Sequence, residues 1–256
     1  MDDPASSNGI VLQNLTKTFQ GRKVLDGLDF TINRGETVVI IGRSGEGKSV
    51  LLKHIVRLLM PETGHVWVDG DEITGMGKTK LFEVRKRFGM LFQGAALFDS
   101  LTICGNVGLG LKENGGHTAE EILDRAHICL AQVGLTEVGD KLPSQLSGGM
   151  KKRAGLARAI AMQPDYILYD EPTTGLDPIT SDAINDLILQ LQAELNVTSI
   201  VVTHDMASAF KVADRIAMIS SGKIIYAAGV DETRDTDHPM VRQFIDGSAQ
   251  GPLDVF

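Results

Sequence analysis

The sequence predicts an α/β fold organised around buried parallel strands. Short runs rich in β-branched and aromatic residues at 37–41 (TVVII), 166–169 (YILY) and 199–203 (SIVVT) have the pattern of fully buried strands. Helix-length apolar segments follow the first run at 49–59 and the second run from Asp177-Pro178 onward. A turn-rich β segment precedes these elements, and a region with helical patterns separates the first run from the second.

Length and composition limit the class of protein. With 256 residues, the chain can form one large domain or two small ones. Asp and Glu number 33 against 25 Lys and Arg, a net charge of −8, and no basic block stands out. This balance counts against nucleic acid as a partner.

The apolar segments, the N-terminus and the cysteines predict the cellular compartment of the protein. No stretch approaches the ~18 apolar residues of a spanning helix. The N-terminus, MDDPASSNG, lacks the positive start and apolar middle of a secretory signal. Cys104 and Cys129 have neither metal nor redox spacing. We therefore expect a cytosolic, soluble protein whose cysteines are reduced and buried.

The N-terminal part is predicted to be antiparallel β structure. Residues 1–9 are interpreted as a flexible leader. Apolar alternations between 10 and 32 are broken by turn signals at Gln20-Gly21 and Asp26-Gly27. Phe19 could stack on a purine base or could pack in a strand core, and the sequence favours neither.

The stretch 42–49 reads GRSGEGKS and fits the phosphate-binding pattern G-x-x-x-x-G-K-[ST]. It lies between a predicted buried strand and a predicted helix, which is the context that such a loop needs. Its glycines let backbone N–H groups turn inward around phosphates, and the helix N-terminus adds positive potential. We expect Lys48 to reach the β- and γ-phosphates of a nucleotide and the Ser49 hydroxyl to bind Mg²⁺.

The middle of the chain is predicted to be mainly helical. A solvated helix (78–87) precedes a strand (88–92) that ends at Gln93, whose amide could reach a metal or a catalytic water or could belong to an ordinary loop. Residues 94–111 are apolar and glycine-rich without clean periodicity, which indicates a buried loop or an exposed docking site. Thr118 and Glu121 have capping-box spacing before a helix with one apolar face.

A second candidate anion site follows at 146–150, LSGGM, before a basic and then alanine-rich helix. Ser147 can cap that helix and leave the Gly148 and Gly149 amides facing outward. A commonplace helix cap is the alternative for this motif.

Polar side chains follow two of the predicted buried strands. Asp170 and Glu171 follow YILY, where carboxylates beside a phosphate loop suit a metal-organising Asp and a water-directing Glu. His204 follows SIVVT, where an imidazole can hydrogen-bond a γ-phosphate. The other five histidines lack such a context.

The order of these motifs, GRSGEGKS, Gln93, LSGGM, YILYDE, GLD and His204, resembles that of the ATP-binding cassette (ABC) family of transporter ATPases. LSGG shortly before a strand that ends in DE distinguishes this family from other P-loop proteins. The resemblance implies an α/β P-loop NTPase fold, in which a RecA-like core carries an N-terminal antiparallel β-subdomain and an inserted helical subdomain at about 94–160. The ATPase domain would span 10–238, with a C-terminal extension at 239–256.

The resemblance also implies ATP hydrolysis with ATP and Mg²⁺ as ligands. Glu171 would be the catalytic glutamate, His204 the switch histidine and Gln93 the Q-loop residue, while Ser49, Gln93 and Asp170 would hold the metal. The other residues expected at the nucleotide are the adenine-stacking Phe19, the phosphate loop, the signature motif and the D-loop aspartate, namely Gly42, Arg43, Ser44, Gly45, Glu46, Gly47, Lys48, Ser49, Val50, Ser147, Gly148, Gly149 and Asp177.

Two departures from the family pattern narrow the match. Met150 stands where most members have glutamine, and Gly175 replaces the usual alanine of the D-loop. Together with FQGAALFDSLT, LYDEPTTGLDP and HPMVRQFIDGSAQGP, they resemble the ATPases of bacterial phospholipid-transport (maintenance of lipid asymmetry) systems. The Ser-Gly-Gly amides are intact, so the two departures give no reason to expect a loss of ATPase activity.

The resemblance implies a set of partners. In such families the LSGG amides of one subunit cap the γ-phosphate bound by another, so a second copy of the chain is expected. Integral-membrane permease subunits, lipid-binding proteins and small accessory subunits are also expected, at the cytoplasmic face of the bacterial inner membrane. We expect residues 94–103 to form the groove that receives the permease, and the tail after Pro239 to clasp the partner ATPase.

Two other functions are alternatives to lipid transport. An importer or exporter ATPase for another solute would share the same motifs. A soluble cassette protein of DNA repair or ribosome rescue usually carries two cassettes or a long coiled-coil insertion, and 256 residues hold neither. The acidic balance also counts against that class.

Overall fold

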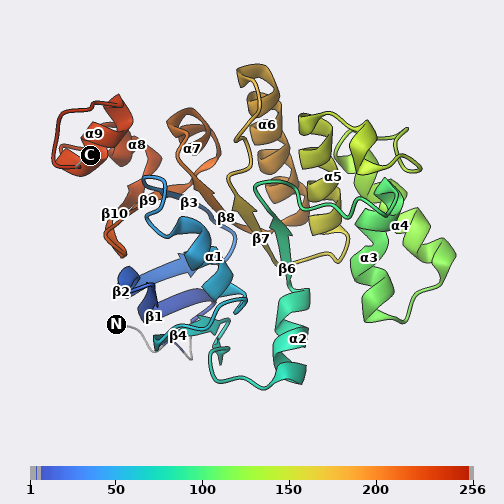
Figure 1. Ribbon diagram of the computed structural model, residues 1–256, viewed down its shortest axis with the longest axis horizontal. Coiled ribbons are helices and arrows are strands. Elements are labelled where there is room, and N and C mark those ends of the chain that lie inside the picture. Colours follow the sequence, from blue (N-terminus) through green and yellow to red (C-terminus); the bar gives the residue numbers. More distant parts are fainter. Residues whose placement is uncertain (1–3, 5–6, 254–256) are drawn as a thin grey trace. The chain divides into compact units, whose positions relative to one another are not determined.

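The chain forms two compact units. The computed structural model describes residues 4 and 7–253, and Figure 1 labels their helices and strands. Unit 1 comprises Met1–Met76 and Val202–Phe256, and unit 2 comprises Gly77–Val201. The leader predicted for residues 1–9 lies mostly outside the described residues. Within the described part of the chain, no helix combines the length and apolarity that crossing a membrane requires.

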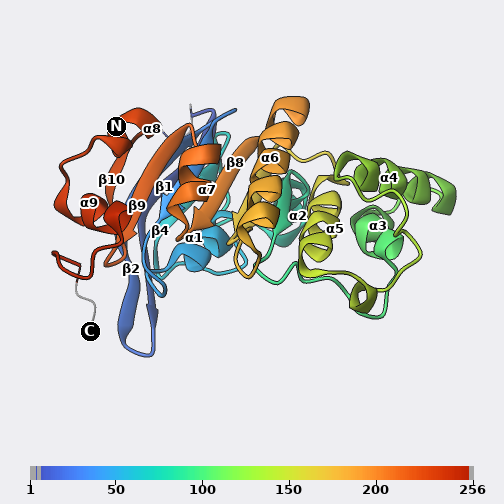
Figure 2. The ribbon, with the colours of Figure 1, turned by 90° about the horizontal axis from the view of Figure 1, so that it is seen from above.

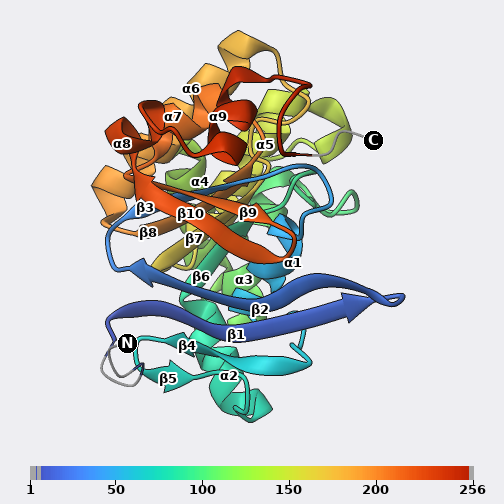
Figure 3. The same cartoon turned by 90° about the vertical axis from the view of Figure 1, so that its left-hand side faces the viewer.

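Unit 1 carries two groups of strands. An antiparallel sheet has the order β2-β1-β4-β5 (Figure 3), and β9 pairs in parallel with β3 and antiparallel with β10. The bounds of the elements are β1 Gly9–Phe19, β2 Arg22–Asn33, β3 Thr37–Ile41, α1 Lys48–Ile55, β4 Thr63–Val68, β5 Asp71–Glu72, α7 Met206–Val212, β9 Arg215–Ser220, β10 Lys223–Gly229, α8 Val230–Arg234 and α9 Pro239–Asp246.

The β1–β2 hairpin confirms one predicted turn and corrects the other. The chain turns at Gln20-Gly21, but Asp26-Gly27 lies inside β2, where the pairing register with β1 shifts. Gly27 adopts a left-handed φ of 67° and its N–H donates to the Thr16 hydroxyl at 3.1 Å, while the Asp26 N–H donates to the Gly222 carbonyl at 3.0 Å. Glycine therefore marks a bulge here, because β1 on one side and the β9–β10 turn on the other hold the backbone in place.

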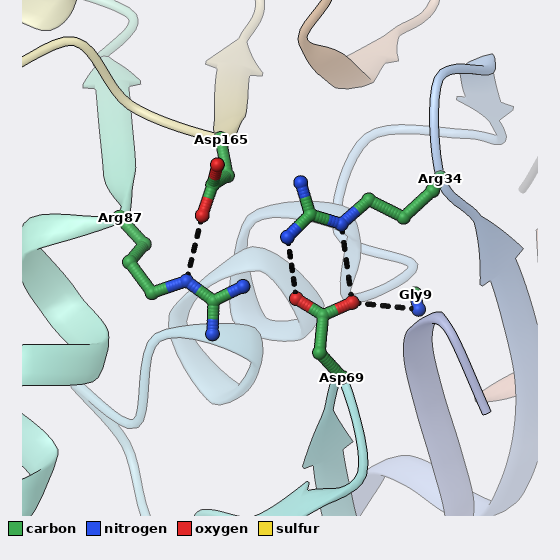
Figure 4. A network of polar contacts seen from close by, with 5 residues as sticks. All are labelled: Gly9, Arg34, Asp69, Arg87 and Asp165. Carbon is green, nitrogen blue, oxygen red and sulfur yellow. Dashed lines mark hydrogen bonds and ion pairs between the residues drawn. The ribbon is translucent and has the colours of Figure 1, made fainter. Parts of the chain in front are cut away.

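A polar network fastens the start of β1 in unit 1. Arg34 makes a two-pronged contact with the Asp69 carboxylate, at 3.2 Å from Nε and 2.8 Å from Nη2 (Figure 4). The same carboxylate accepts the Gly9 N–H at 2.9 Å, and the Asp69 N–H donates to the Gly9 carbonyl at 2.7 Å. The turn after β4 is thus tied to the start of β1 and to the residue that follows β2. These contacts hold the three strands together at this end of the sheet.

Unit 2 combines parallel strands with most of the long helices. The bounds are α2 Lys78–Lys86, β6 Phe88–Leu91, α3 Ile103–Asn114, α4 Ala119–Gln132, α5 Gly148–Ile160, β7 Tyr166–Asp170, α6 Pro178–Leu195 and β8 Thr198–Thr203, whose last two residues belong to unit 1. Helices α3, α4 and α5 lie side by side in both Figure 1 and Figure 2.

Helix α3 corrects the prediction of a buried loop or docking site for all of 94–111. Thr102 caps the helix by accepting the Gly105 N–H, and Ile103, Val107 and Leu111 face inward at helical spacing. A Cβ at Gly108 would lie 2.4 Å from Cγ2 of Ile122 on α4. The glycines that obscured the helical pattern are therefore part of the packing, since one of them lets two helices approach closely.

The pairing of β6 with β7 places the two strand ends together in unit 2. The strands are parallel, and the register pairs Phe88 with Tyr166 and Leu91 with Tyr169. At the start of the pair, Nε of Arg87 donates to the Asp165 carboxylate at 2.7 Å (Figure 4), and the Phe88 and Tyr166 rings stack with centroids 4.9 Å apart. Residues that follow these strands therefore emerge at the same edge of the sheet.

Several smaller predictions have clear outcomes. The capping box of Thr118 and Glu121 is confirmed at α4, and Cys104 and Cys129 are confirmed as buried free thiols. Helix α1 ends at Ile55 rather than near residue 59, because Arg57 adopts a left-handed φ of 50°. The apolar helix predicted from Asp177-Pro178 onward is confirmed as α6, although Ile179 in its first turn is 82% exposed.

Candidate functional site

The loop between β3 and α1 has the backbone that a phosphate cradle requires. All of β3 is buried, and α1 begins at Lys48. Gly45 and Gly47 have left-handed φ values of 83° and 94°. A Cβ at Gly47 would meet the Val24 carbonyl oxygen at 2.9 Å, so the loop needs glycine there for space as well as for conformation.

Two side chains of this loop hold its shape. Lys48 is 6% exposed, and its ammonium donates to the carbonyls of Gly42 at 2.6 Å and Arg43 at 3.0 Å. The Glu46 carboxylate accepts the Ser221 N–H at 2.7 Å and ties the loop to the β9–β10 turn. Lys48 therefore lies beneath the loop where a phosphate would need a cation, while Glu46 has a structural partner.

The other candidates in unit 1 are Phe19 and His204. Phe19 lies at the end of β1 with 41% of its surface exposed, and the Lys17 ammonium is 5.5 Å from its ring centroid. It is therefore not a core residue. His204 is exposed between β8 and α7, and Asp205 caps α7 by accepting the Ala207 N–H at 3.0 Å.

In unit 2 the structure brings Gln93 and Glu171 to one edge. Each follows the paired residues Leu91 and Tyr169 by two positions. Asp170 and Glu171 are 6% and 8% exposed, and Glu171 has a left-handed φ of 51°. The Thr174 hydroxyl donates to the Glu171 carboxylate at 3.0 Å. A strained, buried carboxylate with a fixed orientation is typical of a functional position.

The signature motif forms the N-terminus of α5, as the sequence predicts. The Ser147 side chain accepts the Met150 N–H at 3.3 Å. Ser147 and Gly148 are exposed and Gly149 is buried, where a Cβ would lie 2.6 Å from Cγ2 of Thr180 on α6. Gly149 thus allows α5 to approach α6, while Ser147 and Gly148 lie exposed at the start of the helix.

Asp177, expected at the nucleotide, has a structural task in unit 2. Its carboxylate caps α6 by accepting the N–H groups of Ile179 and Thr180 at 3.0 Å each, and it accepts the Thr180 hydroxyl at 2.6 Å. These hydrogen bonds, led by that from the Thr180 hydroxyl, lower the pKa of the carboxyl.

Lys152 is a candidate that the sequence motifs do not indicate, because the pattern around it predicts only a basic helix. Lys152 is 5% exposed, and its ammonium donates to the carbonyls of Gln93 and Glu171. Burial lowers the pKa of this ammonium, against the opposing influence of the Glu171 and Asp170 carboxylates. Its position three residues before Gly155, on the apolar side of α5, was the available signal.

Comparisons with known proteins identify the family of this chain. Residues 25–174 match the family model described as ABC transporter. The chain is 40% identical over 249 residues to the intermembrane phospholipid transport system ATP-binding protein MlaF of Haemophilus influenzae, covering 97% of this chain and 94% of MlaF. It is also 40% identical over 240 residues to the methionine import ATP-binding protein MetN of Carboxydothermus hydrogenoformans, covering 92% of this chain and 71% of MetN.

A solved structure extends the comparison to three dimensions. The dimeric post-hydrolysis structure of the ATP-binding cassette MJ0796 bound to ADP and Pi superposes with a TM-score of 0.80 at 34% identity. The match covers 86% of this chain and 98% of that one. The phosphate loop, the signature helix and the buried carboxylates thus occur on a cassette ATPase fold, and the chain belongs to the ABC transporter family of ATP-binding proteins.

Proposed function

We propose that this ABC ATPase drives the movement of phospholipid between the inner and outer membranes of a bacterium through a separate permease. One observation carries the proposal: the match to MlaF runs through nearly the full length of both proteins. The equally identical match to MetN leaves more than a quarter of MetN uncovered. Nearly the whole length of this chain therefore corresponds to nearly the whole length of a lipid-transport ATPase.

In the proposed site, phosphate binding belongs to unit 1. The loop amides from Gly42 to Val50 and the Lys48 ammonium bind the phosphates, and Phe19 stacks on the adenine. The left-handed glycines and the buried ammonium support this assignment. His204 contacts the γ-phosphate from the start of the capped helix α7.

Catalysis in the proposed site belongs to unit 2. Glu171 orients the attacking water and accepts its proton, while Gln93 holds that water from the neighbouring strand end. The hydroxyl, amide and carboxylate oxygens of Ser49, Gln93 and Asp170 are the donors that Mg²⁺ prefers, so these residues would hold it. When bound, the ion neutralises charge on the phosphates.

We further propose that the active form is a homodimer. Ser147 and Gly148 are exposed at the N-terminus of α5, where the amides of Ser147, Gly148 and Gly149 in one subunit would cap the γ-phosphate bound by the other. Asp177 belongs to the D-loop, and the D-loop is proposed to lie at the same dimer surface. The dimeric state of the cassette bound to ADP and Pi supports this arrangement.

The permease is proposed to dock on residues 94–103. Phe98 is 53% exposed, yet its backbone is held rigidly because the buried Asn106 amide accepts the Phe98 N–H at 2.7 Å and donates to the Phe98 carbonyl at 3.0 Å. An apolar side chain displayed on a fixed turn suits insertion into a partner. At this location the ATPase is peripheral, at the cytoplasmic face of the inner membrane.

Substitution of Phe98 tests this docking surface. We expect Phe98→Asp to abolish membrane association and coupled lipid transport, because a carboxylate would have to be desolvated in the interface. Phe82→Asp on α2, where the ring is 48% exposed, is the matched control and should leave both intact. Equal retention of transport in the two variants would exclude the 94–103 surface.

The C-terminal extension, 239–256, is proposed to clasp the partner ATPase. Up to Leu253 it folds on α9 of its own chain, where the Gln243 side chain accepts the Leu253 N–H at 2.7 Å and donates to the Ser248 carbonyl at 3.2 Å. This order gives the segment a definite surface to present. Removal of residues 239–256 should shift the molecular mass measured in solution from that of a dimer toward that of a monomer.

The identity of the solute is tested by purifying the chain from detergent-solubilised membranes. Co-purification of a permease with bound phospholipid, together with ATP-dependent transfer of labelled phospholipid between vesicles, is the expected result. The alternative is an ATPase for another solute, which the MetN match favours. ATP-dependent methionine uptake without lipid transfer would establish that alternative. Lipid-binding and small accessory subunits would be identified in the same purification.

A further inference from the structure

The loop that carries Gln93 has a strained backbone within unit 2. Ala95 and Ala96 both have left-handed φ values, 60° and 47°. For a residue with a Cβ, such a conformation is strained and persists only where its surroundings hold it. The turn of 92–96 is closed by the Ala95 N–H, which donates to the Phe92 carbonyl at 2.8 Å.

One side of α5 supplies the groups that hold this loop. The Arg158 guanidinium donates to the Ala96 carbonyl from Nη1 and to the Ala95 carbonyl from Nη2, each at 2.6 Å. At Gly155, a Cβ would lie 2.8 Å from Leu91 and 3.3 Å from the Ala95 Cβ, so glycine is needed for the close approach. Lys152, Gly155 and Arg158 are spaced by three residues and share this side of the helix.

Lys152 contacts more than the loop. Its ammonium donates at 2.5 Å to the carbonyl of Gln93 and at 2.9 Å to the carbonyl of Glu171. One buried cation therefore joins the backbones of the two residues that emerge from β6 and β7. Both hydrogen bonds go to main-chain oxygens, so Lys152 does not occupy the side chains of Gln93 and Glu171.

We infer that Lys152 is a positioning residue for ATP hydrolysis, which sets the placement of Gln93 relative to Glu171 by holding the main-chain carbonyls of both. The inference rests on the proposed roles of these two residues. Because Lys152 lies on α5, which Ser147 caps, it also attaches them to the helix that presents the signature amides. A change in the position of α5 reaches the water-orienting groups through one side chain.

The test separates turnover from nucleotide affinity in the full-length chain. Lys152→Met keeps the aliphatic stem but removes the donors, and kcat should fall about 10- to 100-fold because the glutamate and glutamine are no longer held in register. The Kd for ATP should change by less than about threefold, since the phosphate loop is untouched. Lys152→Arg restores donors and charge and should recover part of kcat.

Controls distinguish positioning from general stability. Lys151→Met, the neighbouring lysine on α5, should retain the wild-type kcat and Tm. Wild-type kcat in Lys152→Met overturns the inference. So does a loss of kcat that is equal in Lys152→Met and Lys152→Arg and that parallels a loss of Tm in both variants. If Lys152→Met does not fold, Lys152→Gln takes its place, and it should show an intermediate kcat at unchanged ATP affinity.

Glu171→Gln is measured in parallel. If it retains turnover, the proposed catalytic role of Glu171 fails, whatever Lys152 does. If it is inactive while Lys152→Met is fully active, only the inference about Lys152 fails.

Discussion

His54 in α1 is a buried imidazole that the ATPase chemistry does not use. It is 0% exposed, and its Nδ1 lies 2.7 Å from the Val50 carbonyl oxygen, to which it donates. Burial lowers the pKa of this imidazole, more than its bond to Val50 raises it. The folded protein therefore holds His54 neutral at a pH where the unfolded chain already binds a proton.

This pKa shift gives the stability a definite pH dependence. The contribution of His54 is complete above the ordinary histidine pKa of about 6.5 and is lost as the pH falls toward the lowered folded-state value, with a slope of at most ~1.4 kcal/mol per pH unit. His54→Asn keeps a donor near the Val50 carbonyl and does not titrate. Urea unfolding between pH 7.5 and 5.5 should show a steeper loss of unfolding free energy in the wild type than in this variant. Parallel curves would contradict the prediction.

At the scale of elements, the contact between α3 and α4 depends on the missing side chain of Gly108. Gly108→Ala should destabilise the protein by about 1–3 kcal/mol through overpacking against Ile122, despite the better helix propensity of alanine. Chemical denaturation measures the change in unfolding free energy.

The second variant of this pair supplies the control. In an Ile122→Ala background the clashing methyl is gone, so Gly108→Ala should become neutral or stabilising. A double-mutant cycle gives the coupling energy directly. Additive effects of the two substitutions would mean that the helices do not meet at these residues.

The same helices show how far sequence patterns reach at this scale. Local patterns predicted two helix starts correctly, at Thr118 with Glu121 and at Ser147 before its glycine pair, because local hydrogen bonds determine where a helix begins. The apolar runs predicted β3, β7 and β8 correctly because burial determines these strands. Helix α3 and the bulge at Asp26-Gly27 were missed because a glycine that serves close packing or a bulge has the same local pattern as a glycine in a loop. Only tertiary neighbours distinguish these cases.

The candidate site shows the same division. Lys48, Ser147 and Glu171 were predicted from motifs whose spacing reflects local geometry. Lys152 was not, because its importance comes from carbonyls 59 and 19 residues away in the sequence. A lysine that pairs with main-chain oxygens leaves no signature in its partners' side chains.

At the scale of the whole molecule, the proposed mechanism assigns Lys48 and Ser147 of one chain to two different nucleotides. A homodimer of Lys48→Ala lacks the phosphate cation at both sites, and a homodimer of Ser147→Arg blocks the signature at both sites. A mixed dimer, however, collects both defects at one site and leaves the other site complete. Co-expression with two affinity tags and purification through both tags isolates that mixed dimer.

The mixed dimer of Lys48→Ala with Ser147→Arg should therefore hydrolyse ATP at about half the wild-type rate, because one of two symmetry-related sites is intact. The matched control is the mixed dimer of Lys48→Ala with Glu171→Gln. Lys48 and Glu171 serve the nucleotide bound by their own chain, so each site of this dimer carries one defect and activity should stay absent. Recovery in the control as well, or in neither mixture, would contradict a site shared between two chains. Recovery in the first mixture alone would require that each ATP be enclosed by the phosphate loop of one subunit and the signature helix of the other.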